Sequence, residues 1–442
     1  TVAAPARAAD GAHLGNGPRR RGGSAPTMIR TTSLASGIDV VTEAMPGSHS
    51  ASIGFWVDAG SRDEEPAVAG ASHFLEHLLF KGTATRSARD IAEAVEAVGG
   101  DMNAFTTKEY TAFYTRLLDD DLDLGLDILS DIMWAPAFRP EEIEAERQVI
   151  LEEILMHEDE PSDLVHELFA EALYPGHPLG REVLGDRSTI TAMTRDDIAA
   201  YFEALYRPQA IVVAAAGNVD HDRVVAGIEE RFAGRSGDRP PRAQPPLAPA
   251  RGVIVSHRPT EQAHVVVGCR ALAREDDDRF ALSVLNQILG GGMSSRLFQE
   301  IREKRGLVYS VYSYRAAYLE SGSLAVYAGT SPARVDEVLD LIDRELDRLL
   351  EEEVTDHELR VAKGHVKGSL ALSLEDSAGR MSRIGRSQLV HGTVMTFEDL
   401  VARTESVRRD DLRRVIERVA GGQRVLAVVG PFPEDAFSAR VA

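Results

Sequence analysis

The chain shows two hydrophobic periods, one typical of strands and one typical of helices. In the first half, apolar residues alternate or cluster as in β-strands over 38–44, 52–59, 102–106 and 111–117. They recur with a helical period over 71–80, 88–98, 119–133, 139–158 and 163–173. Because strands and helices are interspersed without strict alternation, we predict an α+β fold with largely antiparallel sheets.

The second half of the chain repeats this theme. We expect strands near 252–257, 262–269, 308–316 and 322–328, and helices near 277–289 and 295–304, with further helices after them. Each half also closes with an acidic turn, an amphipathic helix and a short apolar strand that ends at a glycine, over 194–218 and 408–431. This matched placement predicts two homologous α/β-sandwich domains related by internal duplication.

A proline-rich stretch at 235–250 interrupts the periodic pattern, with five prolines within ten residues. Such a stretch is a semi-extended spacer. We expect one domain over 29–234 and a second over 251–442, joined by a linker that permits the two halves to open. Residues 1–28 lack hydrophobic periodicity and are rich in Ala, Gly, Pro and Arg, so we expect a disordered N-terminal extension there.

Composition narrows the range of partners. The 442 residues include 49 basic and 70 acidic side chains, a net charge of −21, which argues against nucleic acid because phosphate binding needs clustered Lys and Arg. Cys269 is the only cysteine, so an intramolecular disulfide and a multi-cysteine metal site are excluded. A single cysteine fits a reducing compartment, and no apolar run approaches the roughly 18 residues of a membrane span. We therefore expect a cytoplasmic protein.

The strongest chemical signal is the sequence His-Phe-Leu-Glu-His at 73–77. In a helix, His73 and His77 project from one face about a turn apart, and two imidazoles at this spacing can bind one zinc ion. Glu76 lies beside His77, where its carboxylate can take a proton from a zinc-activated water. Pairs of helix histidines are usually structural or solvated, but the apolar surroundings favour the metal, because unpaired polar groups are costly there.

A catalytic zinc usually has three protein ligands and one open position. The helix predicted at 139–158 offers several candidates for the third ligand, namely Glu141, Glu142, Glu144, Glu146, Glu152, Glu153 and Glu158. Most of them must form a solvated acidic face. Glu146 and Glu153 are two helical turns apart and share one face, but spacing alone does not choose between them.

The motif and its surroundings resemble the M16 family of zinc metallopeptidases, and are most similar to its short bacterial members and to the mitochondrial processing peptidase β subunit. The family has similar residues at 70–72 (GAS) and 78–83 (LLFKGT), on either side of its inverted zinc motif. Its third ligand lies in a segment like ERQVILEE at 146–153. The resemblance implies that Glu153 binds zinc with the two histidines, and that Glu146 supports a histidine from outside the ligand set.

A second segment, at 99–106, is similar to the edge strand of the family, whose backbone pairs with an extended substrate. The resemblance implies substrate contacts at Asn103, Ala104 and Phe105. We therefore expect the substrate to be a peptide in an extended conformation.

A third segment, at 294–309, is similar to the arginine–tyrosine segment of the family. The resemblance implies that Arg302 and Tyr309 bind substrate and stabilise the developing oxyanion. An ordinary basic amphipathic helix that leads into a strand is the alternative. In heterodimeric members, the zinc motif and this pair lie on different subunits, whereas this chain has both. We therefore expect a self-sufficient chain that could form a homodimer.

Together these features predict a zinc endopeptidase with one Zn²⁺ per chain, Glu76 as general base and a chamber between the two halves. Residues 29–234 have 15 basic and 39 acidic side chains, a net charge of −24, whereas residues 251–442 have 27 and 29, a net charge of −2. An acidic catalytic half would attract basic peptides. Two alternatives remain, a non-catalytic family member that serves as a subunit or regulatory partner of another peptidase, and an unrelated acidic binding protein with a fortuitous motif.

Overall fold

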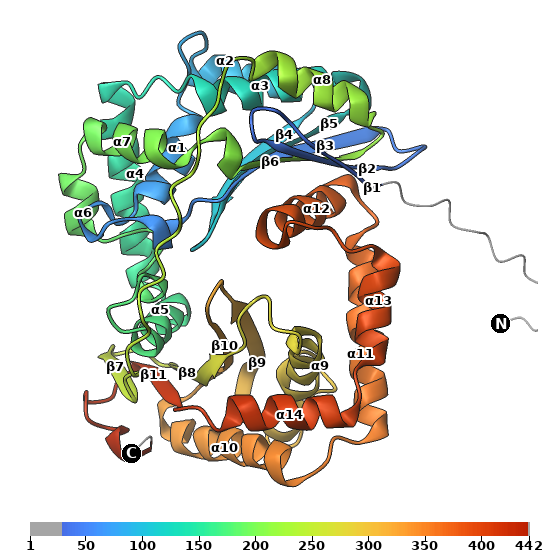
Figure 1. The fold of residues 1–442 in the computed structure, drawn as a ribbon. Helices are drawn as coiled ribbons and strands as arrows, with labels where there is room; N and C mark the ends of the chain where they lie inside the picture. Colours follow the sequence, from blue (N-terminus) through green and yellow to red (C-terminus); the bar gives the residue numbers. More distant parts are fainter. Residues whose placement is uncertain (1–28, 441–442) are drawn as a thin grey trace, which may run out of the picture.

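The computed structural model describes residues 29–440, and the extension expected at 1–28 lies outside them. The described chain forms two sheets with helices packed on them (Figure 1). Most predicted strands and helices are present with bounds shifted by a few residues, and β1 at Ile29–Ser33 is a strand that the hydrophobic pattern did not reveal. The mixed architecture confirms the predicted fold class.

The first sheet has the strand order β1-β2-β6-β3-β5-β4. Its other strands are β2 (Asp39–Ala44), β3 (Ser50–Val57), β4 (Asp101–Thr106), β5 (Thr111–Leu118) and β6 (Ile211–Gly217). β2 and β6 are parallel, and the remaining neighbours are antiparallel. β6 is buried along its whole length, which explains its uninterrupted apolar sequence.

The second sheet has the order β7-β11-β8-β10-β9. Its strands are β7 (Val253–His257), β8 (Ala263–Ala271), β9 (Val308–Ala317), β10 (Gly322–Thr330) and β11 (Val425–Gly430). β7 and β11 form its parallel pair, and β11 also pairs antiparallel with β8. The last strand of each half is therefore inserted at the same place in its sheet, as expected for a duplication.

The helix before each inserted strand is α7 (Arg195–Leu205) in the first half and α14 (Arg409–Ala420) in the second. The other helices of the first half are α1 (Ala71–Leu79), α2 (Ala88–Glu96), α3 (Leu122–Trp134), α4 (Pro140–Glu158), α5 (Pro161–Leu173), α6 (Arg187–Ala192) and α8 (His221–Arg231). Those of the second half are α9 (Arg279–Gly290), α10 (Val335–Glu351), α11 (Asp356–Ser373), α12 (Ser377–His391) and α13 (Phe397–Ser406).

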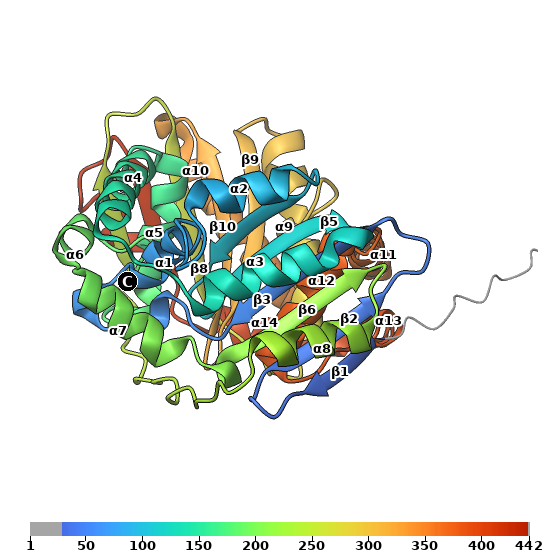
Figure 2. The same cartoon turned by 90° about the horizontal axis from the view of Figure 1, so that it is seen from above.

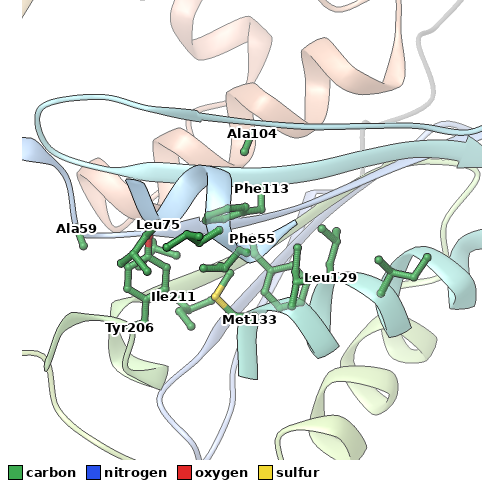
Figure 3. Packing of buried hydrophobic residues seen from close by; sticks show 14 of the residues in the cluster. Phe55, Ala59, Leu75, Ala104, Phe113, Leu129, Met133, Tyr206 and Ile211 are labelled. Atoms are coloured by element: carbon green, nitrogen blue, oxygen red, sulfur yellow. The ribbon is translucent and has the colours of Figure 1, made fainter. Parts of the chain in front are cut away.

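The core of the first half fixes the position of α1. Leu75 of this helix is fully buried among Phe55 and Phe113 of the sheet, as Figure 3 shows. Tyr206 and Ile211, which follow α7, belong to the same cluster. Because the apolar side of α1 is buried in this core, its histidines lie on the side that faces away from the sheet.

One helix from each half packs on the sheet of the other half. Val165 and Phe169 of α5 lie in one buried cluster with Val266 and Tyr327 of the second sheet. In the opposite direction, α12 packs beneath the first sheet, on the face opposite α3 and α8 (Figures 1 and 2). This exchange joins the two halves through their cores, which a hydrophobic period alone cannot indicate.

Buried ionic contacts reinforce this exchange. The buried carboxylate of Glu43 in β2 accepts hydrogen bonds from Arg380 and Arg383 of α12, the latter at 2.9 Å. Residues 235–250 have no regular secondary structure, as expected, but Arg239 and Arg242 bind Asp63 at 2.9 and 2.8 Å. These two ion pairs attach the linker to the first half, and the expected opening of the halves stays a prediction.

None of the helices between residues 29 and 440 is both long enough and apolar enough to cross a membrane.

Candidate metal centre

The helix α1 begins at a carboxylate that satisfies its first backbone donors. Glu64 accepts hydrogen bonds from the backbone N–H groups of Gly70 at 2.8 Å and Ser72 at 2.7 Å. Gly70 has a φ of 94°, a conformation that favours glycine. Burial raises the pKa of Glu64 to about 7, against the lowering effect of these hydrogen bonds. The start of α1, and with it the register of the motif at 73–77, is therefore fixed.

The structure brings His73, His77 and Glu153 together. The Oε2 atom of Glu153 in α4 lies 3.6 Å from the Nε2 atom of His73 and 3.6 Å from the Nε2 atom of His77. The two imidazole rings are 4.7 Å apart at an angle of 69°. One ligand atom from each residue lies within 4.8 Å of the others.

This arrangement fits a zinc ion. Tetrahedral ligands with bonds of about 2.1 Å lie about 3.4 Å from one another, close to the observed separations. The Oε2 atom of Glu153 is buried and has no hydrogen-bond partner among residues 29–440, although buried polar atoms are normally paired. Burial, with a smaller effect from His77, lowers the pKa of His73 to about 3, so its ring is neutral, as a metal ligand must be.

Glu146 supports the cluster from the opposite side of His77. Its Oε2 atom lies 3.0 Å from the Nδ1 atom of His77, and its Oε1 atom lies 2.7 Å from the Nζ atom of Lys81. When the Nδ1–H group of His77 donates to Glu146, the Nε2 lone pair faces Glu153. This is the arrangement of histidines that bind a metal. The structure thus separates Glu146 from Glu153, which the sequence spacing did not.

Glu76 lies beside this cluster and next to the end of β4. Burial raises the pKa of its carboxyl, and the neighbouring Thr106, the last residue of β4, partly offsets that effect. A half-desolvated carboxylate next to a metal site is suited to accept a proton. The neighbouring strand is therefore close to the group that would perform the proton transfer.

Among the strands that the structure describes, β4 pairs only with β5 and is therefore the free edge of the first sheet. Asn103 is exposed, whereas Ala104 is buried and Phe105 is packed against Trp56 and Tyr110. The side chains of Ala104 and Phe105 thus face the protein, and the outer backbone edge is what a partner could pair with.

Arg302 and Tyr309 lie together on the second half. The guanidinium group of Arg302, in a π-helical turn at Phe298–Glu303, lies 5.4 Å from the centre of the Tyr309 ring. The ring of Tyr309, at the start of β9, is 81% exposed. Within residues 29–440, no hydrogen bond or ion pair connects this pair to His73, His77 or Glu153. The structure therefore brings the two residues together, without a direct polar contact to the zinc motif.

A second group of potential ligands, which the sequence did not indicate, consists of His157, Glu167 and Glu182. His157 forms an ion pair directly with Glu167. Burial, with a further effect from the charge of Glu182, raises the pKa of Glu167 to about 8, and the charge of Lys108 partly offsets this. The three residues line a cavity of about 1060 Å³ beneath the segment that joins the two halves.

Two family models match the chain. The model described as insulinase, peptidase family M16, matches residues 39–187. The model described as peptidase M16 inactive domain matches residues 192–365. The first range contains the zinc motif, and the second contains Arg302 and Tyr309.

Relatives of similar length match over most of the chain. An uncharacterized zinc protease of Streptomyces coelicolor is 48% identical over 415 residues, which are 92% of this chain and 90% of the relative. An uncharacterized zinc protease of Mycobacterium tuberculosis is 44% identical over 91% of this chain and 93% of the relative. The uncharacterized zinc protease YmxG of Bacillus subtilis is 37% identical over 91% of this chain and 98% of the relative.

Solved structures share the fold. A protease from Helicobacter pylori superimposes with a TM-score of 0.86 at 23% identity and covers 92% of this chain and 100% of its own. A structure described as a peptidase M16 inactive domain from Pseudomonas fluorescens has a TM-score of 0.86 at 22% identity, and the match covers 92% of this chain and 98% of the other. Both likenesses extend over the two halves of the molecule.

Proposed function

The chain belongs to the M16 peptidase family, and on that premise we propose that it is a zinc-dependent endopeptidase that cleaves extended, basic peptides. The observation that carries the proposal is the Oε2 atom of Glu153, which has no hydrogen-bond partner in the described part of the chain and is equidistant from the Nε2 atoms of His73 and His77. Three protein ligands leave one coordination position open, as catalytic zinc requires. We propose one Zn²⁺ per chain at this site.

Glu76 is the proposed general base. A zinc ion at this site supplies a Lewis acid and lowers the pKa of a neighbouring water. The carboxylate of Glu76 takes the proton of the attacking water and then delivers it to the nitrogen of the scissile peptide bond. Its raised pKa supports this role, because a stronger base accepts the proton more readily.

The substrate is proposed to lie along the free edge of β4. A peptide that pairs there would extend the sheet through backbone hydrogen bonds, with contacts at Asn103, Ala104 and Phe105. The position of Glu76 next to Thr106, the last residue of β4, supports this placement, because it brings the end of this edge beside the proposed base. Cleavage would thus require an extended conformation rather than a folded one.

The acidic surface of residues 29–234, with a net charge of −24, supports a preference for basic peptides. Arg302 and Tyr309 are proposed to bind the substrate and stabilise the oxyanion. Because Tyr309 is exposed at the surface of the second half, it could act within its own chain or, in a homodimer, on a second copy. The free, buried Cys269 supports a reducing compartment and hence a cytoplasmic location.

Incubation of the purified protein with a library of basic and acidic peptides, with and without a zinc chelator, tests this function. We expect cleavage of basic peptides that the chelator abolishes and added zinc restores. The non-catalytic alternative, a subunit or regulatory partner of another peptidase, predicts zinc binding without cleavage. Cleavage that the chelator does not affect would contradict the zinc mechanism.

A further inference from the structure

Lys81 lies in the turn that follows α1, and its side chain points back toward the metal centre. Its Nζ atom is 2.7 Å from the Oε1 atom of Glu146, whose other oxygen lies 3.0 Å from the Nδ1 atom of His77. A continuous chain of polar contacts therefore runs from the ammonium group through the carboxylate to the imidazole.

The turn that carries Lys81 is held rigidly in place. Arg139, at the start of α4, donates hydrogen bonds to the carbonyl oxygens of Thr83 at 2.7 Å and Lys81 at 3.4 Å. Gly82 has a φ of 116°, and a Cβ atom there would lie 2.5 Å from Arg139 and 2.8 Å from the carbonyl oxygen of Arg86. The backbone that carries Lys81 is thus fixed, and the side chain extends from it to its ion pair with Glu146.

Glu146 needs this partner because its side chain is only 7% exposed. A buried carboxylate without a compensating charge is strongly destabilised. The imidazole of His77 is neutral when it binds a metal and provides a hydrogen bond but no charge. Lys81 is the cation paired with Glu146, since the adjacent Arg147 pairs with Glu144 instead.

We propose that Lys81 is a positioning residue of the metal centre, which acts on His77 through Glu146. By pairing with Oε1, it orients the carboxylate so that Oε2 accepts the Nδ1–H group of His77. The ring is thereby held in the tautomer whose Nε2 lone pair faces Glu153. This inference rests on the proposed zinc site, but the tautomer of His77 can be measured without a metal.

The first test measures zinc affinity by competition with a chelator in K81M, K81R, E146Q and the double variant K81M/E146Q. We expect K81M to bind zinc about tenfold more weakly, within the usual range for residues that support a ligand, and K81R to stay within about threefold of wild type. Because Lys81 acts through Glu146, the double variant should bind zinc as E146Q does. K363M, which removes a lysine bonded to the carbonyl oxygen of Glu405 on α13, is the control.

The second test uses ¹⁵N-histidine NMR of the metal-free protein, with His77 assigned from the H77Q variant. We expect the proton on Nδ1 in wild type and K81R, and a shift toward Nε2 in K81M. If K81M does not fold, K81Q serves in both experiments.

The inference is wrong if K81M has the same His77 tautomer and the same zinc affinity as wild type. It is also wrong if the K81M substitution weakens zinc binding by the same factor in E146Q as in wild type. If wild type does not bind zinc but His77 still has its proton on Nδ1 and loses it in K81M, the result would contradict the proposed function and not this inference.

Discussion

The Oε2 atom of Glu153 lies 3.6 Å from the Nε2 atom of His73, although the two residues come from different helices. α1 is held at its start by Glu64 and along its length by the core around Leu75. α4 packs beside it, with the guanidinium of Arg147 over the ring of Phe74 at 5.5 Å. The geometry of the proposed zinc site therefore follows from how these two helices pack.

Removal of the third ligand tests this geometry. We expect E153Q to weaken zinc binding by at least about 100-fold, because it replaces an anionic ligand with a neutral amide. E152Q changes the exposed neighbour on the same helix and should bind zinc as wild type does. Chelator competition measures both. Equal affinities in the two variants would remove Glu153 from the site.

The capping carboxylate of Glu64 predicts a pH dependence of stability. Its pKa is raised from 4.5 to about 7 in the folded protein, so the folded state holds this proton more tightly than the unfolded state. Its contribution to stability is thus complete below about pH 4.5 and is lost as the pH rises through about 7. Relative to E64Q, the free energy of unfolding of wild type should fall by up to about 3 kcal/mol between about pH 4.5 and about pH 8.

Chemical unfolding of both proteins across this pH range measures the difference. E65Q, which changes the exposed neighbour, is the control and should follow wild type. If the difference in the free energy of unfolding between wild type and E64Q did not change with pH, burial would not raise the pKa of Glu64.

Two helix glycines provide a matched test of the exchanged helix α12. A Cβ atom at Gly385 would lie 2.3 Å from the indole nitrogen of Trp56 in the first sheet, whereas nothing lies within 4 Å of a Cβ at Gly364 in α11. We expect G385A to lower the melting temperature, because overpacking destabilises a folded protein by about 1–3 kcal/mol. G364A should leave it unchanged or raise it, because alanine favours helices. A similar response of both variants would contradict the packing of α12 on the first sheet.

Substrate charge predicts a salt dependence. If the acidic half attracts basic peptides, raising the ionic strength from about 0.05 to about 0.5 M should increase the KM for an arginine-rich peptide several-fold, because the Debye length shortens. The same peptide with citrulline in place of arginine should show little change. An unchanged KM for the arginine-rich peptide would refute the charge preference.

Much of the fold could be predicted from hydrophobic periods, because most strands and helices bury one continuous face. The pattern did not reveal the edge strand β1, which is mostly exposed. It also could not assign α5 and α12 to the opposite sheets, since a helical period shows that a face is buried but not against what. The predicted helix at 295–304 contains a π-helical turn at Phe298–Glu303, a distinction that periodicity does not make.

The candidate site was predictable to different degrees. The spacing of His73 and His77 indicated a shared ligand face directly. The choice between Glu146 and Glu153 came from the family resemblance, because both lie on one face of α4, and the structure separates them by their distances to the two ring nitrogens of His77. Lys81 belongs to the family-like stretch at 78–83, but the sequence did not indicate its contact with Glu146, because that partner lies on another helix.

The most direct test of the central claim compares E76Q with wild type in two measurements on the same preparations, the zinc content per chain and the kcat for a basic peptide. The account predicts about one zinc per chain in both proteins and a kcat for E76Q lowered by about 10²–10⁴-fold, the usual contribution of a general base. Full activity of E76Q with zinc bound would contradict the proposed mechanism.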